Sequence, residues 1–139
     1  MAPVSITAIV LAALASFILG FLFHGPLLGK WWIKLADIHP TGNEKFSNMI
    51  PQMFWNLVAN LVTAYALAVV YAFASTSAYT SGASVHTGIL TGILVWLGFL
   101  VTSSSIEVIW MGRKKSLWFF EAACSLVVMI VMGAIIASF

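Results

Sequence analysis

The chain has 139 residues, of which 62% are hydrophobic and 7% are charged, and its formal net charge is +2. Soluble domains carry roughly 25% charged residues, so this composition excludes an ordinary water-soluble fold and indicates a protein whose solvent is the lipid bilayer. The single cysteine, Cys124, excludes an internal disulfide and a cysteine-built zinc site.

The first predicted element is an apolar helix over about residues 4 to 23. At about 1.5 Å per residue it is long enough to cross a hydrocarbon core of roughly 30 Å. No Lys or Arg precedes it, so we expect a retained first helix and not a cleaved signal peptide. Ala12, Ser16 and Gly20 recur every four residues and His24 continues the line, which favours close approach of another helix on this face.

Gly25 and Pro26 then interrupt the helix, because proline disfavours a helical conformation before it and lacks a backbone donor. From residue 27 to residue 38 the apolar side chains recur at helical spacing, with lysines on the opposite face. This pattern predicts an amphipathic helix that lies on the membrane, with indole rings at headgroup level and lysines near anionic lipid. The residues expected at this interface are Lys30, Trp31, Trp32 and Lys34.

A polar loop over residues 41–48 leads to the second predicted span, 51–73, which opens with a proline in its first turn. Gln52, Asn56 and Asn60 follow at four-residue intervals, so three amide side chains share one face of this helix. The connection over residues 74–84 is small, polar and uncharged.

The third predicted span, 86–109, contains Gly88 and Gly92 at a spacing that permits close helix contact. We expect this face and the Ser16 and Gly20 face of the first helix to be closely packed, within one protomer or between protomers. The fourth predicted span covers 117–139, and Gly133 near its end is a further helix-packing residue.

All six Lys and Arg residues lie in two stretches, residues 30–45 and 113–115, and the second holds Arg113, Lys114 and Lys115. Basic loops stay in the cytoplasm, so four spans would place both termini and the middle connection outside. We therefore expect a multi-pass protein of a bacterial-type plasma membrane. The distribution is typical of membrane topology, and we predict no nucleic-acid partner.

Three stretches resemble the small four-helix membrane proteins of the family known as domain of unknown function 1761. They are Gly20 to Trp32, with Pro26, Gly29 and Lys30; Gly88 to Phe99, GILTGILVWLGF; and Met132 to Ile135. The chain has Phe23 and His24 where the family often has a Trp and Tyr pair. The resemblance covers nearly the whole chain and implies a single transmembrane domain, an all-α four-helix bundle with an interfacial helix between the first two spans. It implies no activity.

This topology gathers several polar side chains in the cytoplasmic half of the bundle: Gln52, Asn56, His24, Ser105, Glu107 and Glu121, with Asn60 deeper. Carboxylates inside a membrane are costly unless they are protonated, paired or hydrated. One interpretation is that Glu107 and Glu121 pair with Arg113, Lys114 or Lys115. A second is a shared polar site, reached from the cytoplasm, for a cation, a proton or a small polar solute. Contacts between oligomer subunits are the third.

The sequence contains no motif for an enzyme. His24, Glu107 and Glu121 lack a diagnostic metal-ligand spacing, the serines have no nucleophile motif, and Gly88 and Gly92 are not part of a phosphate-binding loop. We expect no metal and no cofactor. The function we favour is a small transport or channel-like protein that is homo-oligomeric and surrounded by membrane lipids, and the alternative is a non-transporting accessory protein that binds lipid or a membrane partner.

Overall fold

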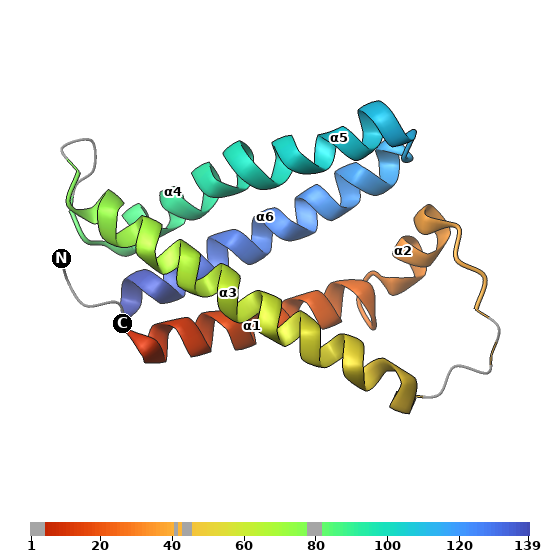
Figure 1. The fold of residues 1–139 in the computed structure, drawn as a ribbon, viewed down its shortest axis with the longest axis horizontal. Coiled ribbons are helices and arrows are strands. Elements are labelled where there is room, and N and C mark those ends of the chain that lie inside the picture. The colour runs from red at the N-terminus through yellow and green to blue at the C-terminus, as the bar shows by residue number, and fades with distance from the viewer. Residues whose placement is uncertain (1–4, 41, 43–45, 78–81) are drawn as a thin grey trace.

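The computed structural model describes residues 5–40, 42, 46–77 and 82–139, and over these residues all regular structure is helical (Figure 1). The elements in chain order are α1 (Ile6–His24), α2 (Gly29–Ala36), the short η1 (Phe46–Met49), α3 (Ile50–Ser75), α4 (Val85–Val95), the π-helical η2 (Trp96–Val101), α5 (Thr102–Met111) and α6 (Lys115–Ser138). Four candidate membrane spans result, because α4, η2 and α5 form one continuous helix, Val85–Met111. The all-α, four-span prediction is confirmed.

The predicted spans and the observed helices differ by a few residues at each end. The first, second, third and fourth spans were expected at 4–23, 51–73, 86–109 and 117–139, and the helices cover 6–24, 50–75, 85–111 and 115–138. The amphipathic helix expected over 27–38 is α2, Gly29–Ala36, and it contacts α1 and α6. The connections expected over 41–48 and 74–84 lie partly outside the described residues.

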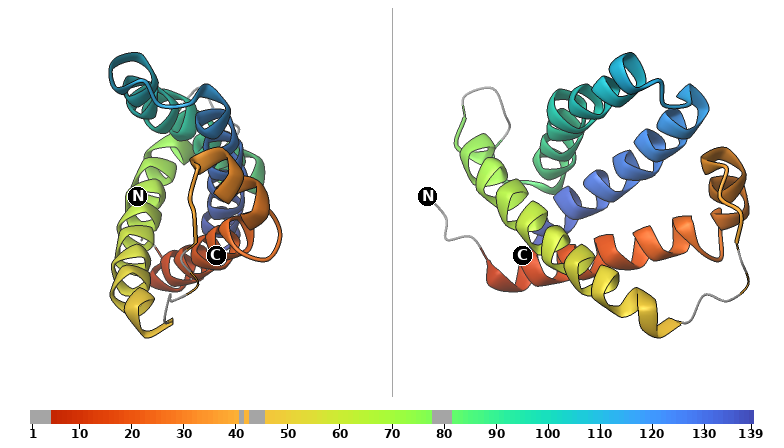
Figure 2. Two further views of the ribbon diagram at one scale, coloured as in Figure 1. Left: turned by 90° about the vertical axis from the view of Figure 1, so that its right-hand side faces the viewer. Right: turned by 45° about the vertical axis from the view of Figure 1, so that its right-hand side comes forward.

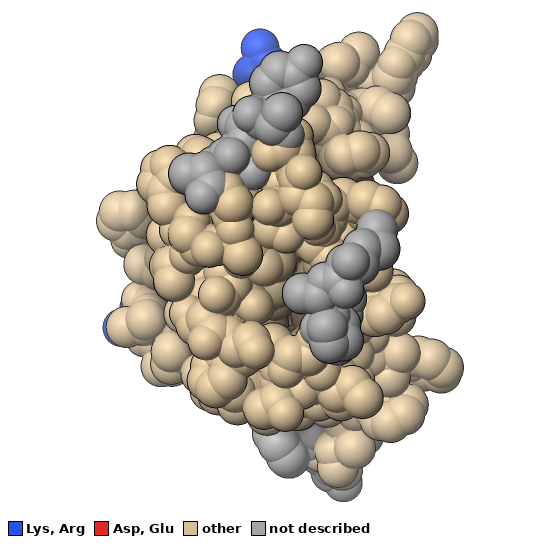
Figure 3. Space-filling view, turned by 90° about the vertical axis from the view of Figure 1, so that its left-hand side faces the viewer, with Lys and Arg blue, Asp and Glu red and all other residues tan. Residues whose placement is uncertain are grey.

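The two ends of the bundle differ in charge. The turn between α5 and α6, the beginning of α3 and the whole of α2 lie at one end, and the beginning of α1 and the end of α6 lie at the other (Figures 1 and 2). Figure 3 faces the latter end and shows almost only uncharged atoms, with blue atoms only at the outline. We call the end that contains α2 and residues 107–121 the charged end and the opposite one the uncharged end. Every charged residue described lies at the charged end: Lys30, Lys34, Asp37, Glu107, Arg113, Lys114, Lys115 and Glu121.

Local signals set the helix ends. Ser5 caps α1 by accepting a hydrogen bond from Ala8 N at 3.3 Å, and Ser84 caps α4 by accepting one from Thr87 N at 3.1 Å. Gly25 follows α1 where an added Cβ would lie 2.7 Å from the Phe21 carbonyl oxygen, so the chain turns at a residue without a side chain. Gly112 ends α5 in the left-handed conformation, with φ of 66°.

The closest helix contact is between α4 and α6. A Cβ added to Gly88 would overlap the Gly133 carbonyl oxygen and lie 2.6 Å from Ala137 Cβ, and one added to Gly92 would overlap the Met129 carbonyl oxygen. The two backbones therefore touch at Gly88 and Gly133, where neither side has a side chain, and again where Gly92 lies against the Met129 backbone. We expected the Gly88 and Gly92 face to pack with the small-residue face of the first helix. That expectation is wrong, because the backbone of α6 at Gly133 lies against the Gly88 face instead.

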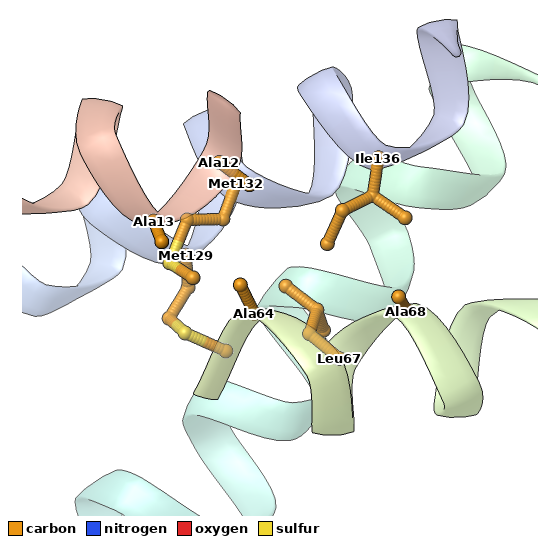
Figure 4. Close-up of a cluster of buried hydrophobic side chains, with 8 residues drawn as sticks. All are labelled: Ala12, Ala13, Ala64, Leu67, Ala68, Met129, Met132 and Ile136. Atoms are coloured by element: carbon orange, nitrogen blue, oxygen red, sulfur yellow. The ribbon is translucent and has the colours of Figure 1, made fainter. Parts of the chain in front are cut away.

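The centre of the bundle is a layer of small and flexible side chains between α1, α3 and α6 (Figure 4). Seven of its eight side chains are at most 2% exposed, and Ile136 is 6% exposed. Alanine lets helices cross closely, and methionine adapts its shape to fill what space remains. We call the following six residues the septum: Ala12, Ala13, Ala64, Leu67, Met129 and Met132.

The third span contains a π-helical segment, Trp96–Val101, that the sequence did not predict. A π segment disturbs the regular backbone ladder, and in lipid each carbonyl needs a donor within the protein. Thr102 Oγ1 donates to the Gly98 carbonyl at 2.7 Å, and Ser103 Oγ donates to the Phe99 carbonyl at 2.5 Å. The hydroxyl-rich stretch after the segment thus supplies additional donors to the carbonyls of the irregular backbone.

Candidate functional site: a groove between α1, α3 and α6

A groove of about 590 Å³ lies between α1, α3 and α6 in the half of the bundle nearer the charged end. It extends from His24 and Met49 near that end to Ser16, Asn60 and Val128 deeper in the bundle. The groove exists because α3 crosses the other two helices and diverges from α1 towards the charged end (Figure 2). The described lining residues are Ser16, Phe17, Gly20, Phe21, Phe23, His24, Met49, Gln52, Met53, Asn56, Asn60, Glu121, Cys124, Ser125 and Val128.

One wall of the groove carries a ladder of amides on α3. Ser16 Oγ of α1 donates to Asn60 Oδ1 at 2.5 Å, and Asn60 Nδ2 donates to Asn56 Oδ1 at 2.6 Å and to the Asn56 carbonyl at 2.9 Å. Gln52 lies one turn further on and also lines the groove. Asn56 thus accepts hydrogen bonds from Asn60 through both its carbonyl and its Oδ1.

The remaining lining is mostly apolar. Phe17, Phe21 and Phe23 come from α1, Met49 and Met53 from η1 and α3, and Val128 from α6. Aromatic rings and thioethers fit the apolar body of a ligand, while the amide ladder offers hydrogen bonds along one side only. The groove is therefore amphipathic, and no continuous polar channel runs along its described lining.

Glu121 is at the rim of the groove, and it is held by Arg113. The Arg113 guanidinium lies between two carboxylates: Nη1 donates to Glu107, and Nη2 donates to Glu121 Oε1 at 2.8 Å. Glu107 is on α5 and Glu121 on α6, so this ion-paired group joins the last two helices at the charged end. The neighbouring Lys114 Nζ lies 3.6 Å from Asp37 Oδ2 and links the same turn to α2.

His24 joins three helices at the rim. Its Nδ1 is 3.0 Å from the Gly20 carbonyl oxygen, within its own helix. Its ring meets Trp32 of α2 edge-on at 5.3 Å between centroids, and Phe120 of α6 at 6.4 Å. This position holds the start of α2 beside the groove.

The chain matches the family described as "Protein of unknown function (DUF1761)" over residues 7–137. It belongs to this family. The resemblance seen in the sequence is thus confirmed, and the family carries no assigned activity. No curated protein and no solved structure matches the chain.

Five of the seven polar residues expected at one site in this DUF1761 protein line the groove: His24, Gln52, Asn56, Asn60 and Glu121. The other two do not. Ser105 Oγ donates to the Thr102 carbonyl of its own helix at 2.7 Å, and Glu107 reaches the site only through Arg113. Among the described residues no group of three or more His, Cys, Asp or Glu side chains could hold a metal ion.

Sequence reasoning missed several lining residues of this DUF1761 protein. Ser16 and Gly20 were assigned to helix packing, but Ser16 holds the amide ladder and Gly20 faces the groove, with nothing within 4 Å of an added Cβ. Cys124 was missed as well, and it lines the groove beside Ser125, whose Oγ accepts a hydrogen bond from Trp96 Nε1 at 3.0 Å. The four-residue spacing from Ser16 to Gly20 to His24 was the signal that could have identified the α1 wall.

The residues expected at the membrane interface divide into two groups in this DUF1761 protein. Trp31 is 69% exposed, and Lys30 and Lys34 are exposed beside it, as an interfacial role requires. Trp32 is half-buried because its ring packs against His24. Of the two tryptophans, Trp31 alone points freely outward.

A second, smaller cavity of about 200 Å³ lies between the same three helices towards the uncharged end. The septum residues lie one helical turn from the deep residues of the groove. Beyond the septum, the second cavity is lined by Ala8, Ala68 and Ile136. The two cavities are thus separated by a single buried layer. The described lining of the second cavity is Ser5, Ala8, Ala68, Tyr71, Ala72, Ser75, Ala83, Ile136, Ala137 and Phe139.

Proposed function

We propose that this membrane protein transports a small molecule through the space between α1, α3 and α6. The observation that supports the proposal is the pair of cavities, about 590 and 200 Å³, which the same three helices line on either side of the septum. A transporter needs a site that is reached from one side and a closed layer towards the other. The groove would be the site and the septum the closed layer.

The septum suits a barrier that rearranges. Five of its six members are too small or too flexible to interlock rigidly: Ala12, Ala13, Ala64, Met129 and Met132. A change in the crossing of α3 over α1 and α6 would close the groove and enlarge the second cavity. The contact between α4 and α6 through Gly88 and Gly133 would meanwhile hold the last two spans together.

The sidedness is part of the proposal. Lys and Arg are retained on the cytoplasmic side of plasma membranes, and all six of them lie in the stretches 30–45 and 113–115. The charged end would therefore be cytoplasmic, with the groove open on that side and both termini outside.

A non-transporting role in binding lipid or a membrane partner is the second candidate. It is favoured by the pairing of both Glu107 and Glu121 with Arg113, which gives each carboxylate a structural ion-pair partner. Self-association belongs to the proposal too, but it requires another surface than the Gly88 and Gly92 face, because α6 of the same protomer occupies that face.

Flux into proteoliposomes tests transport. Protons, rubidium, choline and sucrose form a panel of probes, compared with protein-free liposomes. Gly20→Leu fills the groove, since nothing lies within 4 Å of a Cβ at that position, and should abolish the flux of whichever probe the wild type carries.

Gly98→Leu is the matched control, because the space at Gly98 is equally open and the residue does not line the groove. It should leave the flux unchanged. If no probe crosses faster than in protein-free liposomes, transport is rejected and the binding role stands in its place. If Gly20→Leu and Gly98→Leu carry equal flux, the groove is not the route.

A further inference from the structure

We infer that the groove selects a lipophilic organic cation, a molecule with one delocalised or quaternary positive charge on an apolar body. The inference rests on the proposed role of the groove as a binding site and names the chemistry of its ligand. It follows from the charge, the aromatic lining and the shape of the groove, taken in turn below.

The charge of the lining has one sign. Among the described lining residues Glu121 is the only Asp, Glu, Lys or Arg and His24 is the one histidine, so the groove offers a carboxylate and neither Lys nor Arg. Its carboxylate is at the rim, at the junction of the groove with the charged end. A positive ligand would gain a charged contact here, whereas an anion would face repulsion in a medium of low dielectric constant.

Arg113 does not prevent a ligand cation from contacting the Glu121 carboxylate. Its guanidinium has two carboxylate partners, and the second, Glu107, lies outside the groove. A ligand cation can therefore approach Glu121 from the groove while Arg113 keeps its bond to Glu107. The arrangement of two carboxylates around one guanidinium leaves one negative charge uncompensated within the group.

The aromatic lining extends the argument from charge to ligand type. Phe17, Phe21 and Phe23 present rings from α1 beside the same groove, and ring faces attract cations that carry little hydration. Met49 and Met53 add polarisable sulfur on the opposite wall. A small hydrated ion such as Na⁺ gains little from such walls, because it would exchange water for hydrocarbon.

The volume and the polarity favour a compact cation over a phospholipid. About 590 Å³ is within the range of roughly 300–1,000 Å³ that is typical of pockets for drug-sized molecules. A phospholipid headgroup would place its phosphate beside Glu121, where Arg113 is already shared between two carboxylates.

Binding of three probes of similar shape tests the inference. Tetraphenylphosphonium is the cation, tetraphenylborate the matched anion and triphenylphosphine oxide the neutral compound, each titrated calorimetrically against the purified full chain in dodecyl maltoside. We expect tetraphenylphosphonium to bind most tightly and tetraphenylborate most weakly. Equal binding of cation and anion would overturn the inference.

Substitutions assign the charge effect to one side chain. Glu121→Gln should weaken tetraphenylphosphonium binding by about tenfold, the loss expected for a single charge-assisted contact. Glu107→Gln removes the same charge from the same ion-paired group but outside the groove, so its effect should be about threefold or smaller. An equal loss in the two variants would refute direct contact with Glu121.

Arg113→Gln separates direct contact from a structural role. If Glu121 meets the ligand, removing its guanidinium partner should tighten tetraphenylphosphonium binding, opposite in sign to Glu121→Gln. If Glu121 only stabilises the fold, both variants should weaken it alike, and the inference fails. Competition by phosphatidylethanolamine for the same site would instead assign the groove to a lipid headgroup and overturn the choice of ligand.

The experiments distinguish failure of this inference from failure of the proposed transport. If the neutral probe binds as tightly as the cation and Gly20→Leu abolishes both, the groove remains a binding site and only the cation is wrong. If tetraphenylphosphonium binds in a Glu121-dependent way but no probe crosses the liposome membrane, the cation stands and transport is wrong.

Discussion

The two halves of the bundle pack their helices in opposite ways. Towards the uncharged end α4 and α6 meet backbone to backbone through Gly88, Gly92 and Gly133. Towards the charged end α1, α3 and α6 leave a groove of about 590 Å³ whose polar groups bond across the gap. Close packing stabilises the half towards the uncharged end. The half towards the charged end is less closely packed and contains an accessible site. The difference shows that a small residue does not by itself mark a tight helix contact, since Gly20 faces open space.

The largest expected effect concerns the sidedness of the two ends and is all-or-none. With Cys124 replaced by Ser, single cysteines at Ala83 and Lys115 should react with a membrane-impermeant maleimide from opposite sides of the membrane. The reason is that every described Lys and Arg residue lies at the charged end. The Cys124→Ser protein without added cysteine is the blank, and reaction of both positions from one side would contradict the topology.

Next in size is the loss of the contact between α4 and α6. Gly88→Leu should destabilise the protein by about 3 kcal/mol, because the added side chain would overlap the Gly133 backbone, which cannot move without shifting α6. The free energy of unfolding in mixed detergent, followed by circular dichroism, is the measurement. Gly98→Leu, at an open position of the same span, is the control and should change it little. Equal stability of the two variants would show that the close contact is dispensable.

A smaller loss is expected from the amide ladder. Asn60→Leu removes the acceptor of Ser16 Oγ and the donor to Asn56, and should cost about 1–2 kcal/mol, near the upper range for hydrogen bonds between membrane helices. Thr63→Val is the control, because the Thr63 hydroxyl donates to the Ala59 carbonyl of its own helix and to no other described residue. The same unfolding measurement applies. An equal change in both variants would mean that the bond across the groove adds nothing.

The indole bond between the last two spans should contribute less. Trp96→Phe removes the donor to the Ala122 carbonyl at 3.0 Å and to Ser125 Oγ, with an expected cost of about 0.5–1.5 kcal/mol. Trp110→Phe, at a side chain that is 82% exposed, supplies the baseline for exchanging the ring alone. Detergent unfolding of the pair isolates the bond, and a cost no greater than that of Trp110→Phe would contradict it.

The smallest effect has the opposite sign. Gly20→Ala should stabilise the protein by about 0.5 kcal/mol, since alanine favours the helix and its Cβ meets nothing within 4 Å. Gly92→Ala, at a glycine whose Cβ would overlap the Met129 carbonyl oxygen, should destabilise it. Thermal melting of the two variants side by side measures the contrast. Stabilisation by both would mean that the close half tolerates side chains.

The sequence by itself determined what belongs to single helices. The number of spans follows from the length of the apolar segments, and the placement of the charges is read directly from the sequence. The shared face of Gln52, Asn56 and Asn60 follows from the four-residue period of one helix. The turn after α1 follows from Gly25 and Pro26. Each of these is encoded within a few consecutive residues, so it can be predicted before any tertiary contact is known.

Only the tertiary structure decided which faces meet. Gly88 and Gly92 could pack on any bare helix backbone. That they pack on the helix that contains Gly133 depends on residues about 40 positions away in the sequence. Glu107 and Ser105 share the depth of the predicted site but point elsewhere, because the rotation of α5 about its own axis is set by its packing on α6 and by the π segment before it. Helix periodicity defines the faces of one helix, but the rotation and tilt of each helix depend on all its neighbours at once. The groove is a product of that tilt, and no local pattern in the sequence encodes it.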